Sequence, residues 1–211
     1  MGLFISMSGV VGATEDCVLD ALRAYAENNE GSLKQEELST EDAGCLVISE
    51  GFGGVTVLYP GDFLDWDGAA EYLSKQVQRP VFSFHIHDGD FWMYLLYEDG
   101  EIVDQFNPMP DYWKELEDDE RLSWKGDAAA IARRIPGLAS DHIVKYLKQW
   151  NDGMFDSSGR EKAYPSDRFY YGDDWQLVDF MQKLGFDYPV DDQGKPHGAT
   201  YRFEFKSGET S

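Results

Sequence analysis

Residues 81–107 carry the most regular alternation of apolar and polar positions in the chain, VFSFHIHDGDFWMYLLYEDGEIVDQFN. Two Asp-Gly pairs, at positions 88–89 and 99–100, divide this stretch into three strand-like runs. Asp-Gly suits a two-residue type I′ turn, because both turn positions need a positive φ. Closing the first hairpin at 88–89 would pair His87 with Asp90 and align the two runs beyond them.

Side chains alternate between the two faces of a strand, so this pairing gives each face of the hairpin its own character. One face is wholly apolar: Phe82, Phe84, Ile86, Phe91, Met93 and Leu95. The other face combines histidines, an acid, a hydroxyl group and aromatic rings, and we predict it to be a binding face: Ser83, His85, His87, Asp90, Trp92 and Tyr94.

The patterns before this hairpin predict strands at residues 3–11, 45–49 and 55–59, and two amphipathic helices. The first helix follows Thr14, and the second begins near Asp65 or Asp67 and ends before Pro80. The resulting order predicts an α+β fold with a ferredoxin-like antiparallel sheet and two helices on one face. We expect the apolar face of the hairpin to pack against these two helices.

Two regions are predicted. Residues 1–110 form the ferredoxin-like domain, and residues 111–211 form a mainly helical C-terminal region packed on it, with a frayed tail near 207–211. The second region includes a helix expected from Ser140 onward. It also holds a second aromatic patch: Tyr164, Phe169, Tyr170, Tyr171 and Trp175. This patch either packs a loop onto the sheet or forms an interface, since Tyr and Trp contribute strongly to binding.

The charge of the chain narrows the range of partners. The net charge is −22, from 40 acidic and 18 basic residues. Such a surface repels phosphate backbones and anionic lipids, so we expect neither a nucleic-acid nor a membrane partner. Three explanations stay open: solubility, adaptation to a salty habitat, and attraction to a basic protein.

The two cysteines, Cys17 and Cys45, form neither a disulfide framework nor a CxxC motif, which fits a reducing cytosol. The chain is therefore expected in the cytoplasm. The glycine-rich segment at 51–54 precedes a strand, whereas a dinucleotide-binding loop opens a helix. We predict no cofactor.

Two hypotheses of function follow. The first is a non-enzymatic protein-binding module, in concrete form an immunity or antitoxin-type inhibitor of a basic partner. The alternative is a metal-dependent enzyme, because His85 and His87 share a strand face and Asp90 could complete a set of two histidines and one carboxylate. A short His-x-His motif without a second ligand cluster is also compatible with two ordinary surface histidines.

Overall fold

A computed structural model describes residues 2–36, 44–151 and 161–206, so the predicted frayed tail at 207–211 lies outside the described residues. Strands and helices are both present, as predicted for an α+β protein. The strands are β1 (Ile5–Val11), β2 (Gly31–Gln35), β3 (Leu46–Gly51), β4 (Gly54–Leu58), β5 (Val81–His87), β6 (Phe91–Glu98), β7 (Glu101–Phe106) and β8 (Ala199–Phe205). The α-helices are α1 (Glu15–Asn28), α2 (Trp66–Val77), α3 (Asp118–Ser123), α4 (Ala128–Ala132) and α5 (Gln176–Leu184).

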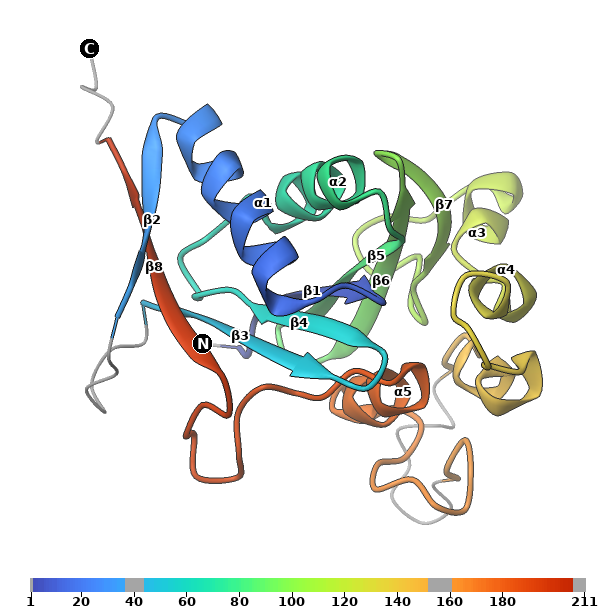
Figure 1. Ribbon diagram of the computed structural model, residues 1–211. Coiled ribbons are helices and arrows are strands. Elements are labelled where there is room, and N and C mark those ends of the chain that lie inside the picture. Colours follow the sequence, from blue (N-terminus) through green and yellow to red (C-terminus); the bar gives the residue numbers. More distant parts are fainter. Residues whose placement is uncertain (1, 37–43, 152–160, 207–211) are drawn as a thin grey trace.

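All the described strands belong to one antiparallel sheet with the order β2-β8-β3-β4-β1-β5-β6-β7 (Figure 1). The last strand, β8, pairs with both β2 and β3. Residues from both sides of the predicted boundary at 110 therefore share one sheet.

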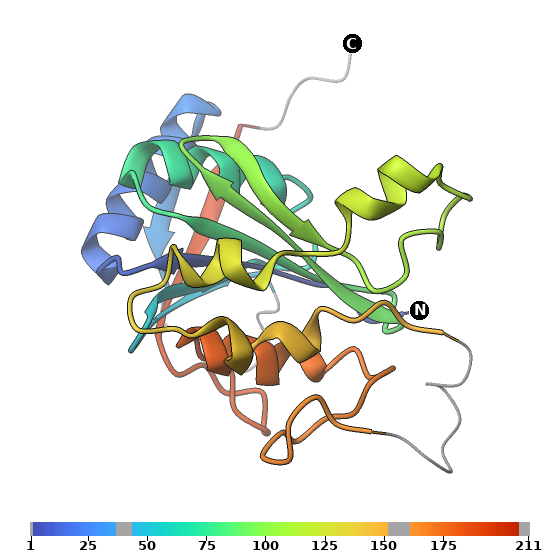
Figure 2. The ribbon, with the colours of Figure 1, turned by 90° about the vertical axis from the view of Figure 1, so that its right-hand side faces the viewer.

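Helices cover both faces of this sheet (Figure 2). The helices α1 and α2 lie on one face, where an apolar core includes Leu22, Val57 and Leu73. On the opposite face, α4, α5 and the segments around them bury a second core that includes Phe84 and Phe180. The sheet is thus the middle layer between two separate cores.

The hairpin between β5 and β6 differs from the prediction by one residue. Asp88 and Gly89 have the left-handed φ values expected of an Asp-Gly turn, 54° and 73°, and the Asp90 N–H donates to the His87 carbonyl at 2.9 Å. However, His87 pairs with Phe91 rather than with Asp90. Asp90 thus adds one residue to the connection, and a shift of one residue exchanges the two faces of a strand.

This shift places Trp92 and Tyr94 on the same face as Phe82 and Phe84, where both aromatic side chains are fully buried. The prediction that they share a face with His85 is wrong. Burial of two large aromatic rings favours the observed register, because each ring removes much apolar surface from water.

The prediction that the apolar face of β5 packs against α1 and α2 is also wrong. Phe84 lies against Phe180 and Phe186 of the C-terminal half, with ring centroids 6.4 Å and 6.0 Å away. His85 lies on the α2 side, stacked on Trp66 at 4.8 Å. The C-terminal half supplies large apolar side chains, whereas α2 presents polar and aromatic groups to this part of β5.

The helix expected from Ser140 onward is replaced by two short 3₁₀ segments, Ser140–His142 and Val144–Tyr146. Ile143 separates them with φ −128° and ψ −19°, outside the helical region. Within the described residues, no helix is long and apolar enough to cross a membrane.

Candidate functional site

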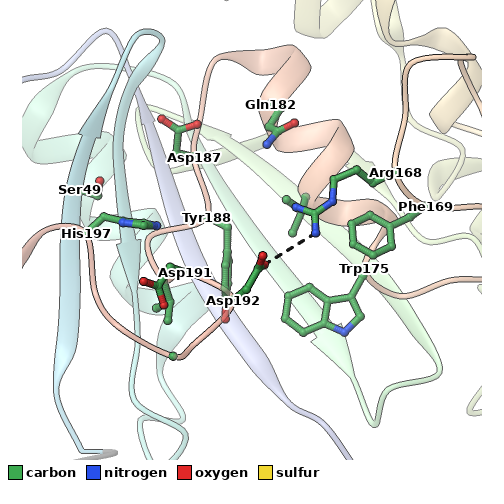
Figure 3. A pocket seen from close by; sticks show the side chains of 13 residues that line it. Ser49, Arg168, Phe169, Trp175, Gln182, Asp187, Tyr188, Asp191, Asp192 and His197 are labelled. Carbon is green, nitrogen blue, oxygen red and sulfur yellow. Dashed lines mark ion pairs between the residues drawn. The ribbon is translucent and has the colours of Figure 1, made fainter. Parts of the chain in front are cut away.

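An open groove of about 830 Å³ lies between α5 and the loop at residues 187–197 (Figure 3). We call it the α5 groove. Charged, polar and aromatic side chains line it, and they come from residues 168–182, from residues 187–197 and from the end of β3: Ser49, Arg168, Phe169, Trp175, Gln182, Asp187, Tyr188, Asp191, Asp192 and His197. Its volume is in the range of pockets that bind small molecules or side chains.

A buried carboxylate holds the α5 wall of the groove in place. Asp179 of α5 accepts the backbone N–H of Arg168 at 3.0 Å and that of Phe169 at 2.8 Å. Burial raises the pKa of Asp179, while these backbone hydrogen bonds oppose that rise. Arg168 and Phe169 are therefore anchored through the main chain, which leaves their side chains available to line the groove.

The opposite wall is a turn stabilised by Asp191. Its Oδ1 atom accepts the N–H groups of Gln193 at 2.9 Å and Lys195 at 2.8 Å. These two hydrogen bonds, led by that from Lys195, lower the pKa of Asp191. Gly194 completes the turn with a φ of 77°, which suits glycine. The loop thus holds an ionised carboxylate at the groove.

Aromatic rings and a cation meet inside the groove. Trp175 and Tyr188 contact each other edge to face, with ring centroids 5.5 Å apart. The Arg168 guanidinium lies 5.3 Å from the centroid of the Phe169 ring, and its Nη2 atom lies 3.8 Å from Oδ1 of Asp192 (Figure 3). This ion pair links the two walls, but both side chains are exposed and the distance is long, so it stabilises by at most about 1 kcal/mol.

The groove has an excess of negative charge. Three aspartates line it, and Arg168 opposes them as the one lysine or arginine among the lining residues. Carboxylates beside aromatic faces are the groups that bind an organic cation, because the ring face is electrostatically negative. The arrangement can therefore accept an ammonium or guanidinium group.

The predicted binding face on the hairpin is not open in this structure. Ser83 donates to Oδ1 of Asp67 at 2.6 Å, and His85 Nδ1 lies 2.9 Å from the Ser6 hydroxyl. The His85 side chain is 3% exposed. Burial is the main cause that lowers the pKa of His85 to about 4, and the charge of the nearby His87 is the second cause. The His85 ring is therefore neutral at neutral pH.

The four other residues of that predicted face lie in two different places. His87 and Asp90 are at the hairpin tip, where Asp90 accepts the Tyr112 hydroxyl at 2.6 Å. Trp92 and Tyr94 are buried on the opposite face of the sheet. The six residues therefore do not form one binding face.

The alternative metal set is not brought together either. The His85 and His87 rings are 5.7 Å apart, and the Asp90 carboxylate accepts the Tyr112 hydroxyl. Across the described ranges, no group of three or more histidine, cysteine, aspartate or glutamate side chains is arranged to hold a metal ion.

The second aromatic patch is divided by the fold. Phe169 and Trp175 line the α5 groove. Tyr171 is buried and donates to the Lys145 carbonyl at 2.7 Å, and Tyr164 donates to the Asp141 carbonyl at 2.6 Å. Tyr170 is exposed beside Lys162, whose Nζ atom lies 5.0 Å from its ring centroid. Two of the five residues thus belong to the groove.

The other wall of the groove is not among the residues predicted from the sequence. The segment Asp191-Asp192-Gln193-Gly194 has the composition of a turn, which was a usable signal. Nothing local indicates that this turn lies opposite Trp175. The position of Arg168 depends on Asp179, which is 11 residues away in the chain.

Comparison with models of known protein families, with curated proteins and with solved structures finds no match. The geometry and charge of the α5 groove are therefore the observations that bear on function.

Proposed function

We propose that this protein is a non-enzymatic binding module that recognises a basic protein partner through the α5 groove. The observation that carries this proposal is the excess of carboxylates in a groove walled by Phe169, Trp175 and Tyr188. Aromatic side chains are frequent hot spots of protein interfaces, and the carboxylates select for a positively charged partner. An immunity or antitoxin-type inhibitor is the concrete version of this module.

The charge of the whole chain supports the same proposal. A net charge of −22 produces a field that accelerates the approach of a basic protein and repels nucleic acid and anionic membranes. The groove then provides local contacts that a diffuse charge cannot. Steering by the surface and recognition by the groove are separate contributions, which an experiment can separate.

We also propose that the N-terminal half contains a ferredoxin-like unit. The strands β3-β4-β1-β5 are neighbours in this order, and α1 and α2 lie on one face of the sheet. This arrangement supports a ferredoxin-like unit within residues 1–110, extended at both sheet edges. The helices α4 and α5 of the C-terminal half pack on its other face, while β8 joins the sheet itself. Neither Cys17 nor Cys45 forms a disulfide, which supports a cytoplasmic location.

The proposal can be tested by affinity capture from the cell that produces the protein. The baits are the wild type, a groove variant with Asp187→Asn and Asp192→Asn, and a control with Asp20→Asn and Asp118→Asn. Both double variants remove the same charge from exposed positions. Capture at about 0.1 M salt is compared with capture at about 1 M salt, where charge is screened within about 3 Å.

We expect the wild type and the control to retain the same basic protein at low salt, and the groove variant to lose it. Recovery of nucleic acid, or of an acidic protein whose binding does not depend on salt, would contradict the proposal. Equal retention by the groove variant and the control would show that the basic partner binds elsewhere on the surface.

A further inference from the structure

The α5 groove already binds one guanidinium group, that of its own Arg168. This group lies over the Phe169 ring at 5.3 Å and faces Asp192 at 3.8 Å. A guanidinium combines a flat face, which stacks on aromatic rings, with a fork of donors, which suits a carboxylate. The intramolecular contacts therefore show the chemistry that the groove offers to a ligand.

The contacts of Arg168 with Asp192 are weak enough to be exchanged. The Arg168 side chain is 61% exposed, and that of Asp192 is 94% exposed. An ion pair of this kind is strongly screened by water and contributes little to stability. An incoming cation can replace Arg168 at Asp192 without breaking any described contact of the core.

The groove also has room and further groups for a second cation. Asp187 and Gln182 lie at one end of the groove, away from the Arg168–Asp192 pair (Figure 3). The rings of Trp175 and Tyr188 lie at the groove wall and provide apolar surface for an alkyl stem. Asp191 is held by its turn, so its charge stays in place.

We infer that the α5 groove binds an arginine side chain of the partner protein, which displaces Arg168 from Asp192 and stacks on an aromatic ring of the groove wall. This inference rests on the proposed function and names the group that the groove recognises. Arg168 acts as an internal competitor that keeps Asp192 paired when no partner is bound.

The test is an NMR titration of the full chain that follows the indole N–H signal of Trp175, assigned with Trp175→Phe. The probe is a capped Gly-Gly-Arg-Gly-Gly peptide. The matched peptide has citrulline, which keeps the shape of arginine but has no charge. We expect saturable binding of the arginine peptide with a dissociation constant on the order of 1 mM, and binding of the citrulline peptide at least about tenfold weaker.

Two pairs of variants separate recognition by the groove from general attraction to an acidic protein. Arg168→Gln removes the competitor and should tighten binding about fivefold. Arg23→Gln is its control, because the Arg23 side chain is 51% exposed beside Asp20 and the substitution removes the same charge elsewhere. Asp192→Asn should weaken binding about fivefold, whereas Asp118→Asn, equally 94% exposed, should not.

The inference would be overturned if Arg168→Gln and Arg23→Gln bound the arginine peptide equally well, or if the Trp175 signal did not respond. If a basic partner is captured through the groove but the peptide does not bind there, the arginine inference fails and the proposed function stands. If neither the partner nor the peptide binds at the groove, both fail.

Discussion

Replacing Gly9 with alanine tests which side of the sheet is buried against the C-terminal half. A Cβ atom at Gly9 would lie 2.8 Å from Cε2 of Phe84 and 3.1 Å from Cε2 of Phe186. Both rings are fully buried, so neither can move without disturbing its neighbours. Overpacking of this kind typically costs about 1–3 kcal/mol, and we expect Gly9→Ala to lower the free energy of unfolding by that amount.

The contact with Phe186 makes this test specific for the observed packing. Phe186→Leu removes the ring edge that the new methyl group would meet. In a double-mutant cycle, we therefore expect Gly9→Ala to cost at least about 1 kcal/mol less in the Phe186→Leu background than in the wild type. Urea unfolding followed by circular dichroism gives the four free energies.

Gly61→Ala is the matched control. A Cβ atom there would meet no atom within 4 Å, and Gly61 is not among the residues with a left-handed φ. Its effect should stay within about 0.5 kcal/mol. Strict additivity of Gly9→Ala and Phe186→Leu would refute the conclusion that this face of β1 and β5 packs against the C-terminal half.

Three further results are expected. Burial lowers the pKa of His85 to about 4, below the value of 6.5 for a free ring. As the pH falls, this histidine therefore binds a proton in the unfolded chain before it does so in the folded protein. Protonation of the unfolded chain should lower the free energy of unfolding of the wild type by about 2 kcal/mol between about pH 7 and pH 5. That loss should disappear in His85→Asn but persist in His142→Asn, at an exposed position, when urea unfolding is repeated at each pH. Tyr94→Phe removes the hydroxyl that donates to Asp104 at 2.6 Å and should lower the free energy of unfolding by about 1–3 kcal/mol, while Tyr170→Phe at an exposed position should change it little. Elemental analysis of protein purified without chelator should find no stoichiometric metal, and one metal ion per chain that is lost in His85→Ala would support the metal-dependent enzyme instead.

Local signals in the sequence predict many of the elements correctly. Thr14 precedes α1 and Asp65 precedes α2, as their positions before amphipathic runs indicate. Both Asp-Gly pairs form turns, with positive φ values at Asp99 and Gly100 as well as at the first turn. These features depend on a few adjacent residues, so a single sequence contains the information needed to predict them.

Features that depend on distant residues were not predictable. Whether Asp90 pairs with His87 or extends the turn is decided by burial of Trp92 and Tyr94 against a region more than 30 residues away. The short 3₁₀ segments around Ile143 break a stripe that suits a regular helix. The α5 groove depends in part on a distant residue, because Ser49 of β3 joins residues 168–182 and 187–197 in its lining.

The dissociation rate of the complex with the captured basic partner shows whether the α5 groove recognises that partner. Stopped-flow measurements would compare the wild type, the Asp187→Asn/Asp192→Asn groove variant and the Asp20→Asn/Asp118→Asn control at several salt concentrations. Association should slow steeply with salt for all three, because the steering charge is spread over the surface. Dissociation should be about tenfold faster for the groove variant alone, since short-range contacts mainly set that rate. Equal dissociation rates for the three proteins would contradict recognition by the α5 groove.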